Sequence, residues 1–374
     1  MAKPQILLSA GEPSGDMYAA RLASALRART DVHLFGMGGP QMREAGVELV
    51  ADLADVAVLG ITEVVRRLPA LRRTMRLLVA EAARRKPALA ILTDFPGFHL
   101  RLARRLRGQD VRNVYFICPQ FWAWRPWRAR LVKRRFVRAL CIFPFEEKFY
   151  RDAGVAVEFI GHPLVDRVRP NGSRAEFAAR YDLNPAEPII ALLPGSRPGE
   201  LRQHLPEFLE ACHLLRKNRP CQFIVALAPG LREREIAAYA RPDVAVHLVE
   251  NATYDALASA DVAIVSSGTA TVEAALLGTP MVVVYRVSSV TAGLAKLLVR
   301  TPFFAMPNLI AGRRIVPELI QDDFTPEKMA GEVSRLLDSG EAREQMKRGL
   351  GEVRTRLGPA GAIERAADCI VKLL

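Results

Sequence analysis

The chain alternates short, continuous runs of Val, Ile and Leu with helix-length amphipathic segments, and it does so in both of its halves. Apolar runs that lie between helices indicate parallel strands buried on both faces. Two such halves predict an α/β fold with two doubly wound, Rossmann-like sheets. We expect strands near residues 5–10, 32–35, 89–93, 112–117, 139–143 and 156–160, and again near 188–193, 222–228, 244–249, 262–266 and 281–285.

The length of 374 residues allows two domains, because a single core usually stops growing well below that size. The segment 161–173 contains two prolines and two glycines, which is typical of a linker. We therefore predict a first domain at 1–165, a second at 166–355, and a C-terminal helix at 356–374 that is able to pack back on the first. Ligands of doubly wound sheets bind beyond the carboxyl ends of the strands, so the active site is expected in a cleft between the domains.

The net charge of +13 is unevenly distributed, because residues 63–138 contain 20 Lys and Arg against 4 Asp and Glu. Such an excess attracts nucleic acid, an anionic membrane or an anionic substrate, whereas the alternative is a set of solvated helix faces. The segment 64–78 interleaves apolar residues with five arginines, including Arg66, Arg67, Arg72 and Arg73. It suits either a helix lying in a membrane interface or a core-packed helix with a basic outer face, interrupted at Pro69.

Cysteine usage and hydropathy place the chain in the cytoplasm. The five cysteines form no CxxC pair and have no His spacing suited to zinc, so they read as reduced thiols. The apolar runs are far too short to span a bilayer, and residues 1–10 enter a strand without the apolar segment of a secretory signal. We expect a cytoplasmic protein.

In the first half, the strand at 5–10 leads into the run AGEPSGD at 10–16, and a second glycine-rich loop follows at 36–39. Glycines let a backbone approach a ligand, and a helix that starts there favours anions. The alternative is a tight strand-to-helix turn in which Ser14 or Asp16 caps the helix. The spacing is not GxGxxG, which disfavours a dinucleotide enzyme.

The strand at 89–93 ends at Asp94, which places a carboxylate at the carboxyl end of a buried strand. Partial desolvation there raises the pKa of a carboxyl group and makes it a better proton acceptor. Asp94 is therefore the candidate general base, although it could instead cap the next helix. Glu12 is the second candidate because its loop can face the same edge. His99 is interpreted as an ordinary residue at a helix start.

In the second half, two strands end in the polar runs PGSRPGE (194–200) and SSGTATVE (266–273). Arg197 can present a fixed positive fork to a diphosphate. The small residues Ser267–Thr271 expose backbone N–H groups at a helix start, which suits phosphate, and Glu273 can accept hydrogen bonds from ribose hydroxyls. The chain has no DxD pair and no GxxxxGK[ST], HExxH or GxSxG motif. We therefore expect no metal and no cofactor, with the leaving group stabilised by Arg197 and helix dipoles.

Seven runs together resemble lipid-A-disaccharide synthases. They are AGEPSGD (10–16), PQFWAWRPWR (119–128), FPFEEKFY (143–150), FIGHPLVD (159–166), LLPGSRPGEL (192–201), SSGTATVEAALLGTPMVVVYR (266–286) and MPNLIAGRRIVPELIQ (306–321). They occur in family order over nearly the full length. The resemblance implies a GT-B fold, with two domains facing a central cleft, the acceptor bound by the first and the UDP-sugar by the second. The family often carries a second aspartate three residues after Asp94, where this chain has Gly97.

The resemblance also implies a reaction: 2,3-diacylglucosamine moves from UDP to 2,3-diacylglucosamine 1-phosphate, giving the β-1,6 lipid A disaccharide and UDP. An α-linked donor that gives a β-linked product requires inversion, with an oxocarbenium-like transition state by analogy with inverting glycosidases. The implied catalytic residues are Asp94, Glu12 and Arg197. The implied UDP-sugar-binding residues are Ser196, Arg197, Ser267, Gly268, Thr269, Ala270, Thr271, Glu273, Asn308 and His162, of which His162 could equally serve a hinge in the linker.

The implied partners are the two acylated substrates and the anionic inner face of the inner membrane, with peripheral attachment, no nucleic acid, and a homodimer as an open option. Two rival functions remain. A nucleic-acid-binding protein would use the aromatic cluster at 121–127 as a stacking platform. Another GT-B enzyme, such as an undecaprenyl-linked transferase or a UDP-sugar epimerase, would share the second-half motifs.

Overall fold

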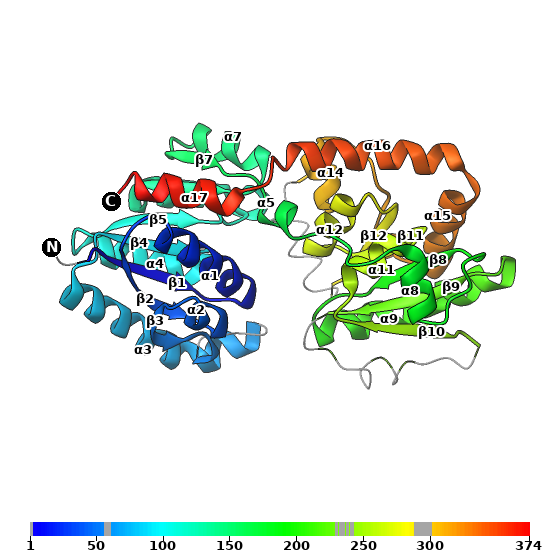
Figure 1. Cartoon of the computed structure of the whole chain (residues 1–374), viewed down its shortest axis with the longest axis horizontal. Coiled ribbons are helices and arrows are strands. Elements are labelled where there is room, and N and C mark those ends of the chain that lie inside the picture. The colour runs from blue at the N-terminus through cyan, green and yellow to red at the C-terminus, as the bar shows by residue number, and fades with distance from the viewer. Residues whose placement is uncertain are drawn as a thin grey trace. The chain divides into compact units, whose positions relative to one another are not determined.

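The computed structural model describes residues 3–55, 61–228, 231, 236, 239, 243–287 and 301–374, and for residues 61–67 it describes the backbone alone. The chain forms two compact units (Figure 1). Unit 1 comprises Met1–Pro163 together with Gly358–Leu374, and unit 2 comprises Leu164–Leu357. No helix among the described residues is both long enough and apolar enough to cross a membrane.

Unit 1 is built on a parallel sheet with the strand order β3-β2-β1-β4-β5-β6-β7. The chain reverses its direction of winding between β1 and β4, which is the position where doubly wound sheets bind ligands. The register pairs Ala10 at the end of β1 with Thr93 at the end of β4, so the loops that follow these strands start side by side. The strands are β1 (Gln5–Ala10), β2 (His33–Gly38), β3 (Glu48–Asp52), β4 (Leu89–Thr93), β5 (Arg112–Phe116), β6 (Arg138–Cys141) and β7 (Val157–Phe159).

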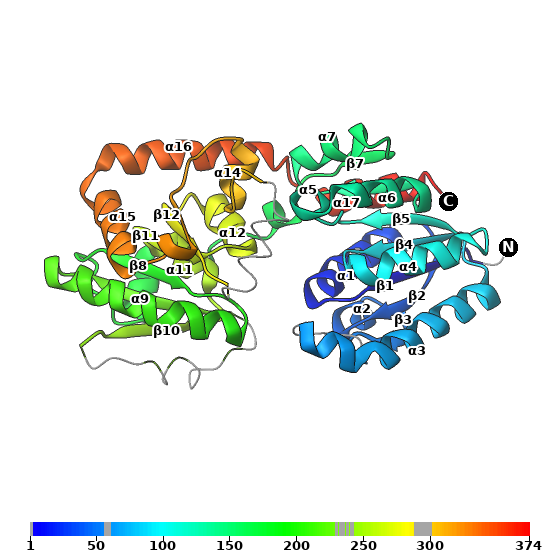
Figure 2. The same ribbon diagram turned by 180° about the vertical axis from the view of Figure 1, so that it is seen from behind.

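Helices cover both faces of this sheet (Figures 1 and 2). One face carries α3, α4 and α6, whose Leu78, Leu102 and Val132 belong to one apolar core with the sheet. The other face carries α1 and α17, which pack against each other. The helices of unit 1 are α1 (Pro13–Arg27), α2 (Pro40–Glu44), α3 (Ile61–Arg85), α4 (Pro96–Arg107), α5 (Phe121–Trp124), α6 (Ala129–Arg135), α7 (Pro144–Asp152) and α17 (Ala362–Val371).

The C-terminal helix α17 is held in unit 1 by polar contacts as well as by packing. Asp368 accepts a hydrogen bond from Arg29 Nε at 2.6 Å, and Arg365 Nε donates to the Ile160 carbonyl at 2.9 Å. The chain therefore returns to its first unit after completing the second.

Unit 2 repeats the same strand order in a six-stranded parallel sheet, β10-β9-β8-β11-β12-β13. The strands are β8 (Ile189–Leu193), β9 (Gln222–Leu227), β10 (Val246–Glu250), β11 (Val262–Ser266), β12 (Met281–Tyr285) and β13 (Glu318–Ile320). The helices are α8 (Arg174–Arg180), α9 (Pro198–Asn218), α11 (Thr253–Ser259), α12 (Thr269–Leu277), α14 (Met306–Ala311), α15 (Pro326–Asp338) and α16 (Gly340–Arg356). The switch in winding lies between β8 and β11, where Leu193 pairs with Val265.

Helix α3 differs from the expectation in two ways. It continues through Pro69 without a break. Its apolar residues Met75 and Leu78 are buried in the core of unit 1, so this side of the helix is not free to enter a bilayer. Within the described side chains, Met75 and Leu78 follow the core-packed alternative, whereas Arg72, Arg73 and Leu77 are exposed, and the attachment of this helix to a membrane stays a prediction. The side chains of Arg66 and Arg67 lie outside the described residues.

Candidate functional site

The carboxyl edge of the unit 1 sheet brings the two predicted carboxylates together. Glu12 is the residue from which α1 begins, and Asp94 follows β4 on the neighbouring strand. The two loops are in close contact, because a Cβ placed on Gly11 would lie 2.0 Å from the ring of Phe95. Gly11 is thus required by packing between these loops.

The backbone of Asp94 is held in an unusual conformation. The φ angle of Asp94 is 47° and that of Phe95 is 45°. Both lie in the left-handed region, which residues other than glycine seldom adopt. The Asp94 carbonyl accepts hydrogen bonds from Tyr115 Oη at 2.9 Å and from His99 Nδ1 at 2.8 Å. These two contacts hold the Asp94 backbone carbonyl at the end of β4.

His99 helps to hold this backbone conformation through its hydrogen bond to the Asp94 carbonyl. Since a carbonyl only accepts hydrogen bonds, the His99 proton is assigned to Nδ1, and Nε2 accepts from Ser9 Oγ at 2.9 Å. Burial lowers the pKa of His99 to about 4, which keeps the ring neutral. His99 is a buried structural residue, as its sequence context indicated.

The Asp94 carboxyl group is half-buried, and its pKa is raised to about 7, first by burial and second by the negative charge of Glu12. A carboxyl group with a pKa near neutrality combines a substantial ionised fraction with a strong tendency to take up a proton. Asp94 thus has the electrostatic setting of a general base.

Asp16 has a structural role across the sheet edge. Its buried carboxylate accepts hydrogen bonds from the backbone N–H groups of Gly39, Gln41 and Met42, at 2.6, 3.1 and 3.3 Å. Asp16 therefore ties the loop at 10–16 to the glycine-rich loop at 36–39 and orders α2, whereas sequence analysis considered it only as a cap of its own helix.

Glu146 is a second carboxyl group with a raised pKa, and sequence analysis did not single it out. It is fully buried, Oε1 accepts from Trp122 Nε1 at 3.0 Å, and Oε2 accepts from the Phe143 N–H at 3.3 Å. Burial raises its pKa to about 8. His162 packs nearby against the Phe143 ring, with centroids 5.0 Å apart, and burial lowers its pKa to about 3. The sequence signal that could have found this buried cluster is the pair of aromatic-rich runs at 119–128 and 143–150.

Unit 2 contains a pocket of about 570 Å³ at the carboxyl ends of β8, β11 and β12. The starts of α9 and α12 both reach it, and the first turn of a helix leaves backbone N–H groups without intrahelical partners. Seven predicted residues line the pocket: Ser196, Arg197, Ser267, Gly268, Thr269, Ala270 and Glu273.

The first turn of α9 is fixed by Glu200. Its Oε2 accepts hydrogen bonds from the N–H groups of Ser196 at 2.8 Å and Arg197 at 3.3 Å. Gly195 has a φ of 128°, and a Cβ there would lie 2.5 Å from Glu200 Oε2. The Arg197 side chain remains 70% exposed, with its guanidinium 3.5 Å from Glu200. Arg197 is therefore available to an anion in the pocket.

Glu273 faces the same pocket from the first turns of α12. Its carboxylate accepts from Tyr254 Oη at 3.2 Å, and burial raises its pKa. A carboxylate placed here can accept further hydrogen bonds from hydroxyl groups of a ligand.

Three predicted residues do not line this pocket. Thr271 is buried, and its Oγ1 donates to the Gly268 carbonyl at 2.7 Å. Asn308 is fully buried, where its amide accepts from the N–H groups of Ile315 and Val316 and donates to Glu318, at 2.7, 3.0 and 2.8 Å. His162 belongs to unit 1.

His204, which sequence analysis missed, joins three of the loops that build the pocket. Its Nδ1 lies 2.8 Å from the Pro194 carbonyl and 3.3 Å from Ser266 Oγ, and its Nε2 lies 3.2 Å from the Arg286 N–H. These partners follow or end β8, β11 and β12, so one buried ring sets the spacing of three strand ends.

Comparison with known proteins identifies the family. The family model described as lipid-A-disaccharide synthetase matches residues 6–370. A lipid-A-disaccharide synthase of Myxococcus xanthus is 46% identical, covering 99% of this chain and 98% of that protein. One of Acidobacterium capsulatum is 47% identical, covering 96% and 93%. The chain belongs to the lipid-A-disaccharide synthase family.

Solved structures show the fold. The UDP-GlcNAc 2-epimerase of Neisseria meningitidis bound to UDP-GlcNAc matches with a TM-score of 0.66 at 13% identity, covering 99% of this chain and all of that one. MurG of Acinetobacter baumannii matches with a TM-score of 0.60 at 15% identity, covering 99% and 100%. A calicheamicin glycosyltransferase matches with a TM-score of 0.61 at 19% identity, covering 100% and 99%. This member of the family is a glycosyltransferase with the GT-B fold.

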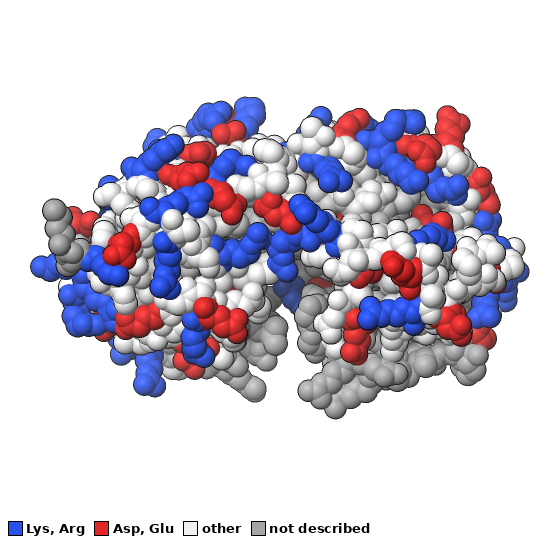
Figure 3. Space-filling view, in the orientation of Figure 1, with Lys and Arg blue, Asp and Glu red and all other residues white. Residues whose placement is uncertain are grey.

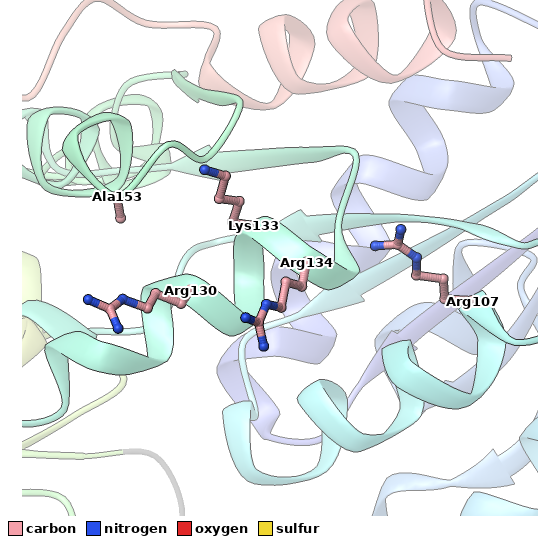
Figure 4. Close-up of a pocket in the computed structure, with 5 residues that line it drawn as sticks. All are labelled: Arg107, Arg130, Lys133, Arg134 and Ala153. Carbon is pink, nitrogen blue, oxygen red and sulfur yellow. The ribbon is translucent and has the colours of Figure 1, made fainter.

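The basic excess found in the sequence gathers on one face of unit 1. A pocket of about 670 Å³ there is lined by four cations from α4 and α6, namely Arg107, Arg130, Lys133 and Arg134, with Ala153 at its rim (Figure 4). By contrast, positive and negative side chains are interspersed on the face that carries α1 and α17 (Figure 3). The segments that sequence analysis found basic thus share one face of one sheet.

Within the described parts of the chain, no three His, Cys, Asp or Glu side chains lie close enough together to hold a metal ion.

Proposed function

We propose that the protein transfers 2,3-diacylglucosamine from UDP to the 6-hydroxyl of 2,3-diacylglucosamine 1-phosphate with inversion, releasing UDP. The observation that carries this proposal is the unit 2 pocket, where two helix starts, the exposed Arg197 and the carboxylate of Glu273 meet. Such a set of groups fits a nucleoside diphosphate. Family membership supports the choice of sugar and acceptor.

In the proposed step, the acceptor 6-oxygen forms a bond to the anomeric carbon while the bond from that carbon to the UDP oxygen breaks. The electron pair of the broken bond leaves with UDP, and the hydroxyl proton passes to Asp94. The pKa of Asp94, raised to about 7, suits this role. Arg197 would stabilise the charge that grows on the departing diphosphate, and Glu273 would accept hydrogen bonds from ribose.

The test is incubation of the purified protein with UDP-2,3-diacylglucosamine and 2,3-diacylglucosamine 1-phosphate. We expect one equivalent of UDP for each disaccharide, and a β-linkage by the coupling constant of the new anomeric proton. An α-linkage would contradict the inverting mechanism. A second incubation with UDP-N-acetylglucosamine alone tests the epimerase alternative, which requires a new UDP-sugar without an acceptor.

We also propose that the protein attaches peripherally to the cytoplasmic face of the inner membrane, through the basic face of α4 and α6 in place of the apolar side of α3. Each cation near an anionic surface contributes about 1 kcal/mol. Lys133→Glu/Arg134→Glu should weaken sedimentation with vesicles that contain anionic lipid. The matched control is Arg348→Glu/Arg354→Glu on α16, which reverses two exposed charges in unit 2. An equal loss of vesicle sedimentation in both variants would show that the basic face of α4 and α6 is not the attachment surface.

A further inference from the structure

All three tryptophans of the chain lie in the segment 119–128, which follows β5. β5 pairs with β4, and the register places Phe116 opposite Thr93. The segment therefore begins at the same sheet edge as Asp94. Trp124 and Trp127 are 37% and 58% exposed, which is unusual for such large apolar side chains.

Arg128 lies among these rings. Its Cζ is 5.7 Å from the ring centre of Phe121, 5.7 Å from Trp124 and 5.5 Å from Trp127. Arg125 also stacks on Trp124, with its Cζ 4.2 Å from that ring centre. Stacked guanidinium groups are held in a fixed orientation while their N–H edges stay free for a ligand.

The charge of Arg128 is not compensated within the described residues. Its Nε is buried and has no hydrogen-bond partner there. Its pKa is lowered by burial and then by the positive charges of Arg125 and Arg101. A buried donor without an acceptor is costly, as is a cluster of like charges, so an anion bound here would remove both costs.

Arg128 and the candidate base both interact with the buried Tyr115. The buried Tyr115 has its pKa raised by burial and next by Asp94, while Arg128 acts on the same hydroxyl in the opposite direction. The Tyr115 hydroxyl donates to the Asp94 carbonyl at 2.9 Å. An anion on Arg128 would thus lie at the same sheet edge as Asp94, because the segment that carries Arg128 follows β5 and β5 pairs with β4.

We propose that Arg128, with Arg125, binds the phosphate monoester of the acceptor, and that the exposed rings of Trp124 and Trp127 contact the acceptor's apolar chains. This assignment rests on the acceptor named in the proposed function. The shared chemistry is a phosphate with an adjoining apolar group, which a phospholipid of the bilayer would also present. The tests below separate these two sources.

The tryptophans provide a readout that does not depend on activity. Because every tryptophan lies in this segment, intrinsic fluorescence reports on the site directly. Glucosamine 1-phosphate should produce a saturable change, and glucosamine should not. Arg128→Gln should abolish the change, whereas Arg128→Lys should retain part of it because the charge remains. Arg112→Gln is the matched control, since Arg112 is exposed at the opposite end of β5. A response that survives Arg128→Gln would overturn the proposal.

Kinetics in detergent micelles give the second test. The wild-type enzyme should prefer 2,3-diacylglucosamine 1-phosphate to the same acceptor without phosphate. Arg128→Gln should reduce this preference by about 10- to 100-fold, through the acceptor KM, with UDP affinity unchanged, as for a lost charge-assisted hydrogen bond. An unchanged preference combined with weaker binding to anionic vesicles would assign Arg128 to a bilayer headgroup and overturn the proposal. If the wild-type enzyme makes no disaccharide, the proposed function fails, while the fluorescence titration still decides the phosphate site.

Discussion

In both sheets the first strand pairs with the fourth at the switch in winding, β1 with β4 in unit 1 and β8 with β11 in unit 2. The side chains at these two edges differ. Unit 1 places a half-buried carboxyl group with a pKa near 7 on a strained backbone held by two hydrogen bonds. Unit 2 offers helix starts, small residues and an exposed arginine.

The difference shows how one topology serves two chemical tasks. The unit 1 edge half-buries a carboxyl group and so raises its pKa, which suits the proposed proton transfer. The unit 2 edge leaves polar groups open to solvent, which suits binding and releasing a charged ligand. Each prediction below perturbs one edge and asks whether the other is unaffected.

The largest effect is expected at Asp94. Asp94→Asn should lower kcat by about 100-fold or more, because the hydroxyl proton then has no acceptor. UDP binding, measured by calorimetry, should stay near the wild-type value because the proposed nucleotide pocket lies in unit 2. Turnover near wild type would remove Asp94 from the mechanism, and a large loss in Glu12→Gln would then identify Glu12 as the base.

The second prediction concerns Arg197, at the carboxyl edge of the unit 2 sheet. Arg197→Ala should lower kcat by about 10- to 100-fold at saturating donor, and donor affinity by less, since diphosphate charge grows as the bond breaks. Arg202→Ala is the control, because Arg202 is exposed on the same helix and does not line the pocket. Equal losses in kcat and in donor affinity would mean that Arg197 binds ground state and transition state alike.

A third prediction concerns Gly97, which stands where the family often has a second aspartate. A Cβ at this position meets no atom within 4 Å, so the site accepts a side chain. Adding Gly97→Asp to the Asp94→Asn variant should restore kcat by about tenfold, if a carboxylate one turn further can reach the same proton. No recovery in a correctly folded double variant would show that the position of the base at Asp94 is essential.

The pH dependence of kcat/KM should follow Asp94. The ionised form is active, so activity should rise with pH around an apparent pKa of about 7. Glu12 raises this pKa through its negative charge. Glu12→Gln should therefore move the midpoint to lower pH. A midpoint that stays in place would show that Glu12 does not act on the titrating group.

The smallest effect is a change of stability at Glu146. Its pKa is raised from 4.5 to about 8, so the folded protein keeps a proton that the unfolded chain releases. The free energy of unfolding should therefore fall as pH rises through this window, by at most about 1.4 kcal/mol per pH unit for one proton. Glu146→Gln should flatten this dependence, measured by urea unfolding at several pH values. An unchanged slope would assign the dependence to other groups.

Much of the fold could be predicted because buried parallel strands leave a direct trace in the sequence. The run Leu89–Thr93 is continuous and apolar, and it is a strand in the structure. The strands β3 and β13 were missed because neither has a continuous apolar run, whereas β7 and β10, which also lie at sheet edges, were predicted. Such short strands are selected by pairing with a neighbour, which a local pattern does not contain.

The residues of the candidate sites also divide into those that the sequence could predict and those that it could not. Polar residues at strand ends, such as Asp94, Arg197 and Glu273, could be chosen from the sequence because position after a buried strand predicts exposure at the ligand edge. Asn308 was chosen from the family run alone, and in the structure its amide is used within the loop at 308–318. A polar residue in a familiar run can serve a ligand or the backbone, and sequence does not separate the two.

The sequence by itself determined the two doubly wound sheets, the positions of most of their strands along the chain and the carboxylate at the end of β4, because burial periodicity and strand ends are local properties of the chain. Only the tertiary structure decided what holds those groups. Tyr115 and His99 hydrogen-bond the Asp94 carbonyl, His204 joins three loops of unit 2, and Glu146 is buried against Trp122. Apart from the His99–Asp94 contact, which spans five residues, these contacts join different elements of the fold, and the burial that shifts a pKa arises only once the elements have packed.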